Sequence, residues 1–527
     1  MEVVDQWTGR HAMALRLALR LTIDGFAGRL GTAVRTVSKW NAYPNLVPIV
    51  EMQRALDTLL FQSPDDVKTR FAMLLTTVDD VAHAGTDELP PPTTVELRLT
   101  GDRHVSAALE WLDRAAGWTP GSARARVAER LNATDARRLQ DRAHLRGQVR
   151  QHAIADALST YYGGGAAGHQ PYRVRTSAGL ATTSVLTQPA WLDLALPLGG
   201  SIDGLQFSPT PTRSPLLDSV AVDAALQRFA DVLALDMLMV NAPIYRLTSL
   251  MLGNGRLAGT VALADFVEYA LTMDLLENEL VDALVAGQPT MPGHLPLRDR
   301  CLPDVSTLLN LERRFCAGGV LALTAIARPA GRRRGHADYL LLVQERSGRV
   351  LNAARRLAVI PKSFHEPLVD YGNDALLGAT LEREMEEELF GRTDVDSALG
   401  EFRSADPMHP SRLSEPMRWL LDRTGGEHWR MECTGFGLNL VSGNYEFASL
   451  IVIEDDEWWG RFGGHIEANW ESGSLRRYSS RDRDLLTALA HDDAWSNEGL
   501  FALFQGFRRL VEVGGDRVDL PTVEWEF

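Results

Sequence analysis

Apolar residues recur every three or four positions along the first 80 residues, and this spacing predicts helices. The expected helices span residues 13–21, 23–30, 33–40, 51–61 and 65–75. Gly31 separates two of them and permits a tight reversal of the chain. The side chains expected to form the core are Phe26, Ala27, Leu30, Val37 and Trp40. The pattern therefore predicts a compact all-helical domain at residues 1–84.

The helical pattern breaks at residues 85–94, where three consecutive prolines favour an extended linker. It returns over residues 95–162, a region that contains eleven arginines. One reading is that these arginines face a DNA backbone or a partner helix, and the other is that they form the solvated face of an ordinary helical domain. The glycine-rich run at residues 163–168 predicts a second boundary.

Residues 163–300 are predicted to form a central, mostly helical domain. Short apolar pieces at residues 172–186 and 191–198 have lengths that suit strands or turns, whereas residues 222–237 and 266–284 are long and helically periodic. No catalytic constellation is evident in this region, so it does not indicate a function.

The pattern changes again in residues 301–527, where short apolar runs rich in β-branched residues predict strands. The expected strands span residues 319–328, 339–345, 357–360, 431–440 and 446–454. A glutamate-rich helix is expected after the third strand, and a closing helix at residues 497–511. This order of elements predicts an α/β sandwich with an insertion at residues 394–429.

The amino-acid composition limits the classes of protein to which this chain can belong. The chain of 527 residues has 45% hydrophobic and 23% charged residues, as ordinary soluble globular proteins do. The sequence has no run of about eighteen apolar residues and no signal-peptide pattern, so we expect a cytoplasmic protein without a membrane partner. Its three cysteines lie far apart and are expected to be buried thiols. The net charge is −15, but between Arg10 and Arg54 seven basic residues face two acidic ones, a balance that suits DNA binding.

The segment LTIDGFAGRLGTAVRTVSKWN at residues 21–41 resembles the helix-turn-helix of XRE (lambda-repressor-like) regulators. The resemblance implies that the second helix of the motif enters the major groove of double-stranded DNA and that the protein acts as a homodimer. The residues on its DNA-facing side are Arg35, Thr36, Ser38 and Lys39. Gly25 and Asn41 depart from the usual pattern. The alternative is a helical scaffold for protein contact.

The glutamate-rich helix contains Arg-Glu-Met-Glu-Glu-Glu at residues 383–388, which resembles the central part of the Nudix box. In an α-helix Glu384, Glu387 and Glu388 share one face. The resemblance implies that these three carboxylates hold Mg²⁺ or Mn²⁺ and that Arg383 orients the neighbouring carboxylate, so all four residues are catalytic if the domain is active. The motif is incomplete, because Val369, Ala375 and Phe390 stand where the family has Gly, Glu and Gly. The alternative is a solvated acidic helix face.

The loop before this helix lacks the glycine pair of the Nudix family. Residues 360–367 have the sequence IPKSFHEP in its place. Lys362 and His365 are candidates for contacting a phosphate, and Glu366 is a candidate ligand or base, as are Asp370 and Asp374. We therefore expect Lys362, His365 and Glu366 to bind a ligand.

The sequence thus predicts a multidomain protein with an all-α helix-turn-helix head, a helical middle and a C-terminal α/β Nudix-like sandwich at residues 301–527. The preferred hypothesis is a DNA-binding transcriptional regulator whose Nudix-like domain senses a nucleotide or sugar-phosphate ligand. The alternative is a Mg²⁺-dependent Nudix hydrolase of a nucleoside diphosphate derivative with an accessory DNA-binding head. A third class, an interaction scaffold, would bind neither DNA nor nucleotide.

Overall fold

A computed structural model gives the fold of the chain as two compact units, residues Met1–Pro92 and Thr93–Phe527. Residues 7–19, 21, 23–32, 34–42, 46–64, 67–68, 71, 99 and 101–526 are described, except for gaps at 200–202, 210–215, 236, 238, 254, 332–334, 348–354, 393–407, 423–427, 465 and 467–471. The predicted linker at residues 85–94 and most of the predicted helix at 65–75 lie outside the described residues. In the described part of the chain, no helix combines the length and apolarity needed to cross a membrane.

The first unit is helical, as predicted. Its helices are α1 (Gly9–Ala18), α2 (Ile23–Leu30), α3 (Val34–Ala42) and α4 (Val50–Gln62). The first of these begins four residues earlier than predicted. Gly31 has φ +64°, the left-handed conformation that the turn between α2 and α3 requires. All five predicted core side chains are buried in one cluster: Phe26, Ala27, Leu30, Val37 and Trp40. The Trp7 indole closes this cluster and donates to Asp57 Oδ1 at 2.6 Å.

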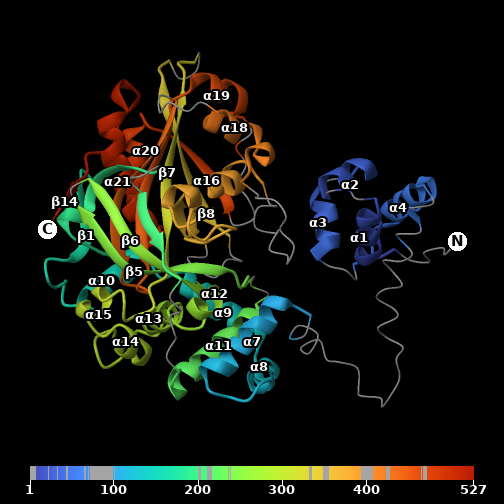
Figure 1. Ribbon diagram of the computed structural model, residues 1–527, viewed down its shortest axis with the longest axis horizontal. Coiled ribbons are helices and arrows are strands. Elements are labelled where there is room, and N and C mark those ends of the chain that lie inside the picture. Colours follow the sequence, from blue (N-terminus) through green and yellow to red (C-terminus); the bar gives the residue numbers. More distant parts are fainter. Residues whose placement is uncertain are drawn as a thin grey trace. The chain divides into compact units, whose positions relative to one another are not determined.

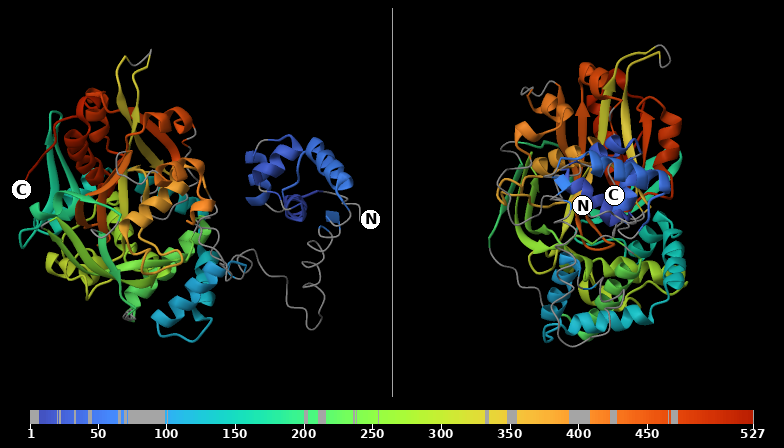
Figure 2. Two further views of the ribbon diagram at one scale, coloured as in Figure 1. Left: turned by 45° about the horizontal axis from the view of Figure 1, so that its top comes forward. Right: turned by 90° about the vertical axis from the view of Figure 1, so that its right-hand side faces the viewer.

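The second unit is built on a large mixed sheet (Figure 1). Its strands are β1 (Gln170–Thr176), β2 (Gly179–Thr187), β3 (Leu192–Pro197), β7 (Gly318–Arg328), β8 (Asp338–Arg346), β9 (Leu357–Val359), β10 (Lys362–Phe364), β11 (Trp429–Asn439), β12 (Tyr445–Ile453), β13 (Ser472–Ser479) and β14 (Glu524–Trp525). The main path runs β13-β8-β7-β12-β11-β2-β1-β14. The central strands β7 and β12 are parallel, and the β7–β8 hairpin projects beyond the helical layers (Figure 2). The five strands predicted beyond residue 300 are confirmed to within two residues at each end.

Helices cover both faces of this sheet. The strand β7 alternates between two cores: Val320, Ala322 and Ile326 belong to one, and Leu321 and Leu323 to the other. The helix α16 (Leu377–Glu384) packs on the first face, and α21 (Asn497–Val513), which matches the predicted closing helix, packs on the second. A strand that is buried on both faces is apolar at nearly every position, which is why the sequence predicted β7 well.

The arginine-rich region is helical, as predicted, and several of its arginines hold it to the rest of the second unit. Its helices are α7 (Arg103–Ala115), α8 (Ser122–Ala133), α9 (Ala136–Gly147) and α10 (Gln151–Tyr161). Arg130 on α8 pairs with Asp223 on α11 (Ser219–Ala234). Arg146 on α9 pairs with Asp282 on α13 (Leu275–Val285) at 2.6 Å. These two charge pairs attach the arginine-rich helices to α11 and α13 of the same unit.

Two sequence predictions about the middle of the chain are corrected. Neither residue 163 nor residue 300 is a boundary between compact units, because β1, β2 and β3 share a sheet with β7 to β13. Residues 163–300 are also not mostly helical. They include the three-stranded sheet β4-β6-β5, made of β4 (Asp203–Phe207), β5 (Pro243–Gly253) and β6 (Arg256–Asp265). The Asn254-Gly255 dipeptide between two apolar runs is a hairpin signal in the sequence.

Candidate functional site

The predicted DNA-facing residues lie on α3 of the first unit. Ser38 and Lys39 are exposed, and Thr36 is half-buried. The side chain of Arg35 lies outside the described residues. The buried neighbours Val37 and Trp40 point into the core, so α3 presents Ser38 and Lys39 on its solvent side.

The glutamate-rich segment differs from the prediction in its helix type. The α-helix α16 ends at Glu384, and a π-helical turn, Met385–Leu389, follows. The amide of Phe390 donates to Met385 O at 3.2 Å, five residues back. The predicted one-face placement of Glu384, Glu387 and Glu388 assumed α-helical spacing throughout, so the wider turn invalidates that assumption.

The glutamates are buried rather than solvated, which excludes the acidic-face alternative for this segment. Arg383 donates to Glu384 Oε1 at 2.9 Å and to the carbonyl of Glu366 at 2.9 Å. Glu388 Oε2 accepts the backbone N–H of Lys362 at 2.8 Å. Glu387 is 5% exposed.

These contacts bear on the predicted metal site. Among the described residues, no three His, Cys, Asp or Glu side chains are grouped so that they would hold a metal ion. Glu384 and Glu388 accept hydrogen bonds from protein groups. A Mg²⁺ or Mn²⁺ site at Glu384, Glu387 and Glu388 therefore stays a prediction.

The three predicted ligand-binding side chains lie in different surroundings. Lys362, on β10, lines a cavity. His365 is fully buried, its Nδ1 is 3.0 Å from the Tyr445 hydroxyl, and burial lowers its pKa to about 3. His365 is therefore a neutral core residue, which corrects its prediction as a phosphate contact. Glu366 is half-buried and does not line the cavity.

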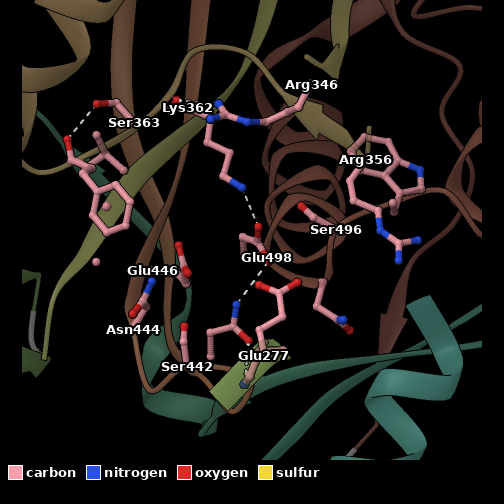
Figure 3. A pocket seen from close by; sticks show the side chains of 18 of the residues that line it. Glu277, Arg346, Arg356, Lys362, Ser363, Ser442, Asn444, Glu446, Ser496 and Glu498 are labelled. Atoms are coloured by element: carbon pink, nitrogen blue, oxygen red, sulfur yellow. Dashed lines mark hydrogen bonds and ion pairs between the residues drawn. The ribbon is translucent and has the colours of Figure 1, made fainter. Parts of the chain in front are cut away.

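The cavity around Lys362 is a candidate site that gathers charged side chains from five elements and from the segment before β9 (Figure 3). Its free volume is about 70 Å³. The charged residues in its wall are Glu277 on α13, Arg346 on β8, Arg356 before β9, Lys362 on β10, Glu446 on β12 and Glu498 on α21. Polar side chains complete the wall: Ser363, Asn439, Ser442, Asn444, Ser496 and Asn497.

Two glycines at the start of β7 allow the strands to meet at this cavity. A Cβ at Gly318 would lie 2.0 Å from Tyr445 O, and one at Gly319 would lie 2.0 Å from Ser363 O. Neither position accommodates a side chain without moving β10 or β12. Both glycines therefore keep Lys362 and Glu446, on β10 and β12, close to the same space.

Within the cavity, Glu498 is the centre of a hydrogen-bonded group. Lys362 Nζ lies 2.5 Å from Glu498 Oε1, and Asn439 Nδ2 donates to Glu498 Oε2 at 3.1 Å (Figure 3). Asn439 Oδ1 in turn accepts from the Ser184 hydroxyl at 3.0 Å. Glu498 lies in the first turn of α21, where the helix dipole also favours a negative charge.

The three cavity carboxyls differ in their electrostatic surroundings. Burial alone would raise the pKa of Glu498, but the Lys362 ammonium holds that pKa below its usual value. Burial raises the pKa of Glu446 well above its usual value, and the Glu498 carboxylate reinforces the shift. Burial raises the pKa of Glu277 to about 7, with further contributions from Asp274 and Glu498. The cavity therefore combines a carboxyl whose charged form is favoured at Glu498, one whose charged form is disfavoured at Glu446, and one at Glu277 with a pKa of about 7.

Sequence reasoning found Lys362 but missed most of the other wall residues, including Glu277, Arg356, Glu446 and Glu498. Glu498 had a local signal, because Ser496-Asn497-Glu498 begins a predicted helix. Glu277 and Arg356 are distant in sequence, and only the tertiary fold brings them together. The sequence matches no protein-family model and no curated protein.

Proposed function

We propose that this chain is a DNA-binding transcriptional regulator, acting as a homodimer, whose second unit senses a nucleotide or sugar-phosphate ligand. The observation that carries the proposal is the cavity around Lys362, which combines cationic and carboxyl side chains inside one unit. Such a mixture suits a ligand with both anionic oxygens and hydroxyl groups, since arginine and lysine bind phosphates and carboxylates accept from hydroxyls.

The first unit supports the DNA-binding half of the proposal. It has the helix order and the turn glycine of the motif it resembles, with Ser38 and Lys39 on the solvent side of α3. In this hypothesis Lys39 contacts a phosphate, and binding of a ligand in the second unit shifts the protein toward one DNA-binding state.

The test of DNA binding uses the full chain, with fluorescence anisotropy on double-stranded DNA selected from a random pool. Lys39→Gln is expected to weaken binding several-fold and to reduce the salt dependence of the binding constant by about one counterion. Arg54→Gln is the matched control, because Arg54 is exposed on α4 and the substitution removes the same charge. Equal effects of both substitutions, or no selected DNA, would refute a DNA-reading role for α3.

The test of ligand sensing is calorimetric titration of the full chain with nucleotides, sugar phosphates and nucleoside diphosphate sugars, followed by the DNA assay with each binder. A ligand that binds and changes the DNA affinity supports the regulator. A ligand that binds without any effect on DNA argues against coupling between the units.

One observation favours the hydrolase alternative. Arg383 pairs with Glu384, as the resemblance to the Nudix box implies. Phosphate release measured with Mg²⁺ on the same compounds tests it. Turnover that is lost in Glu387→Gln would make the hydrolase the better description, and binding without turnover would favour the sensor.

A further inference from the structure

The cavity around Lys362, here called the first cavity, adjoins a larger one in the same unit. The second cavity has a volume of about 560 Å³ and is lined by residues of α9, α11 and α13 and by the segment before β9. Glu277 and Arg356 line both cavities. The two spaces therefore share one wall, made of a carboxyl and a guanidinium group.

The two cavities differ in volume, and the volume limits what each of them can hold. The first has about 70 Å³ of free space, enough for a few water molecules or one compact polar group. Binding sites for small molecules typically have volumes of about 300–1,000 Å³. A nucleotide-sized ligand that reached Lys362 would therefore have to place most of its atoms in the second cavity.

The charges of the second cavity suit an anion. Its wall carries four arginines and a histidine against two carboxyls: Arg146, Arg228, Arg355, Arg356 and His144 against Asp274 and Glu277. Two of the arginines have carboxylate partners: Arg228 lies 2.7 Å from Asp274, and Arg146 lies 2.6 Å from Asp282. Arg355 and Arg356 are consecutive, and Arg356 also lines the first cavity.

The Arg356 side chain is fixed where it lines both cavities. Its NH2 group donates to the carbonyl of Val149 at 2.5 Å, which fixes the guanidinium, and a guanidinium has further N–H donors. Burial lowers the pKa of Arg356, and Glu277 and Glu498 counteract this shift. Arg355 is exposed and has φ +61°, a conformation that residues other than glycine rarely adopt.

We propose that the two cavities form one bipartite site for an elongated phosphorylated ligand. Its phosphate lies in the second cavity against Arg355 and Arg356. Its hydroxyl- or amino-bearing end enters the first cavity, where Glu277, Asn439 and Glu446 take its hydrogen bonds. This inference rests on the proposed ligand sensing and specifies the ligand as one with two separated polar ends.

The test is calorimetry on the full chain with three probes: ADP-ribose, adenosine and inorganic pyrophosphate. The wild type is expected to bind ADP-ribose at least tenfold more tightly than either fragment. Ala143→Trp fills the second cavity from α9, where Ala143 is exposed, and is expected to weaken ADP-ribose and pyrophosphate at least tenfold. Ala125→Trp, exposed on α8 and outside both cavities, is the matched control.

Two further variants separate the ends of the ligand. Arg355→Gln is expected to weaken ADP-ribose and pyrophosphate by about tenfold, with Arg124→Gln on α8 as its charge-matched control. Glu446→Gln is expected to weaken adenosine and ADP-ribose but not pyrophosphate. Thermal unfolding of each variant checks that it folds like its control.

The outcomes distinguish the inference from the proposed function. If ADP-ribose binds and Glu446→Gln weakens it while Ala143→Trp and Arg355→Gln do not, the ligand occupies the first cavity alone, and the bipartite site is wrong although sensing stands. If the wild type binds none of the three probes, both the bipartite site and the proposed ligand class are wrong.

Discussion

Two groups of glutamates lie in the second unit, and the protein uses them differently. In the segment at residues 384–388 the carboxylates are consecutive or nearly so, and Glu384 and Glu388 accept hydrogen bonds from Arg383 and from the Lys362 backbone. In the first cavity the carboxyls come from three distant elements and line open space. In this chain the run of consecutive acidic residues packs against protein groups, whereas glutamates far apart in the sequence line a cavity.

The largest expected effect is on Glu498, because its removal leaves the Lys362 ammonium without its ion-pair partner. Glu498→Gln is expected to lower the free energy of unfolding by about 3–5 kcal/mol, the usual cost of breaking a buried pair from one side. Urea unfolding measures it. The double variant Lys362→Met/Glu498→Gln should recover part of the loss, and a loss as large in the double variant would show that the pair is not the cause.

The next largest effect is a pH dependence of the unfolding free energy that arises from Glu277. Its pKa is about 7 in the folded protein and about 4.5 unfolded, so its contribution to stability is complete below pH 4.5 and is lost as the pH rises to about 7. The loss amounts to at most about 3.5 kcal/mol, at roughly 1.4 kcal/mol per pKa unit. Unfolding of the wild type and of Glu277→Gln between pH 5 and pH 8 measures it. Parallel curves for the two proteins would contradict the raised pKa.

A smaller effect is expected at Glu388, whose Oε2 accepts the Lys362 N–H and whose Oε1 accepts from Gln344 Nε2 at 3.4 Å. Glu388→Gln is expected to cost about 2 kcal/mol, because a charged acceptor of buried hydrogen bonds is replaced by a neutral one. The same loss is expected with EDTA and with Mg²⁺. A loss that appears only with Mg²⁺ would show that Glu388 binds the metal instead.

The smallest effect on the free energy of unfolding is expected for a substitution of Glu446. Burial raises the pKa of Glu446 and so disfavours its charged form, and glutamine has the same shape without the charge. Glu446→Gln should therefore change the unfolding free energy by less than about 1 kcal/mol at pH 7. Thermal and urea unfolding measure it, with Glu498→Gln as the contrasting variant. A loss as large as that of Glu498→Gln would mean that Glu446 is ionised.

The sequence predicted best those strands that are buried on both faces and the helix that has a clear cap. The strands β7 and β12 are buried on both faces, so nearly every position is apolar, and the helix α21 has a clear cap at Ser496. The hairpin of β5 and β6 was missed because one of its ends is exposed and its apolar pattern resembles that of a helix. The Asn254-Gly255 dipeptide was the better signal in the sequence.

The candidate site was predicted far less well than the fold. Lys362 was identified because it lies in the loop before the glutamate helix. Its partner Glu498 lies 136 residues further on, and no local pattern connects the two. The π-helical turn at residues 385–389 also has no evident periodic signal, so the predicted face of Glu384, Glu387 and Glu388 assumed the commoner helix.

Lys362 is bonded to residues on both faces of the sheet, and this has a consequence for how the helical layers can move. Its backbone N–H binds Glu388, which follows the helix on one face, and its ammonium binds Glu498 in the helix on the other face. Lys362 thus connects the two helical layers through two hydrogen bonds. Sliding of one layer past the other would require breaking one of these two bonds. A ligand group that drew the ammonium away from Glu498 would remove one of these two contacts and so weaken the link between the helical layers.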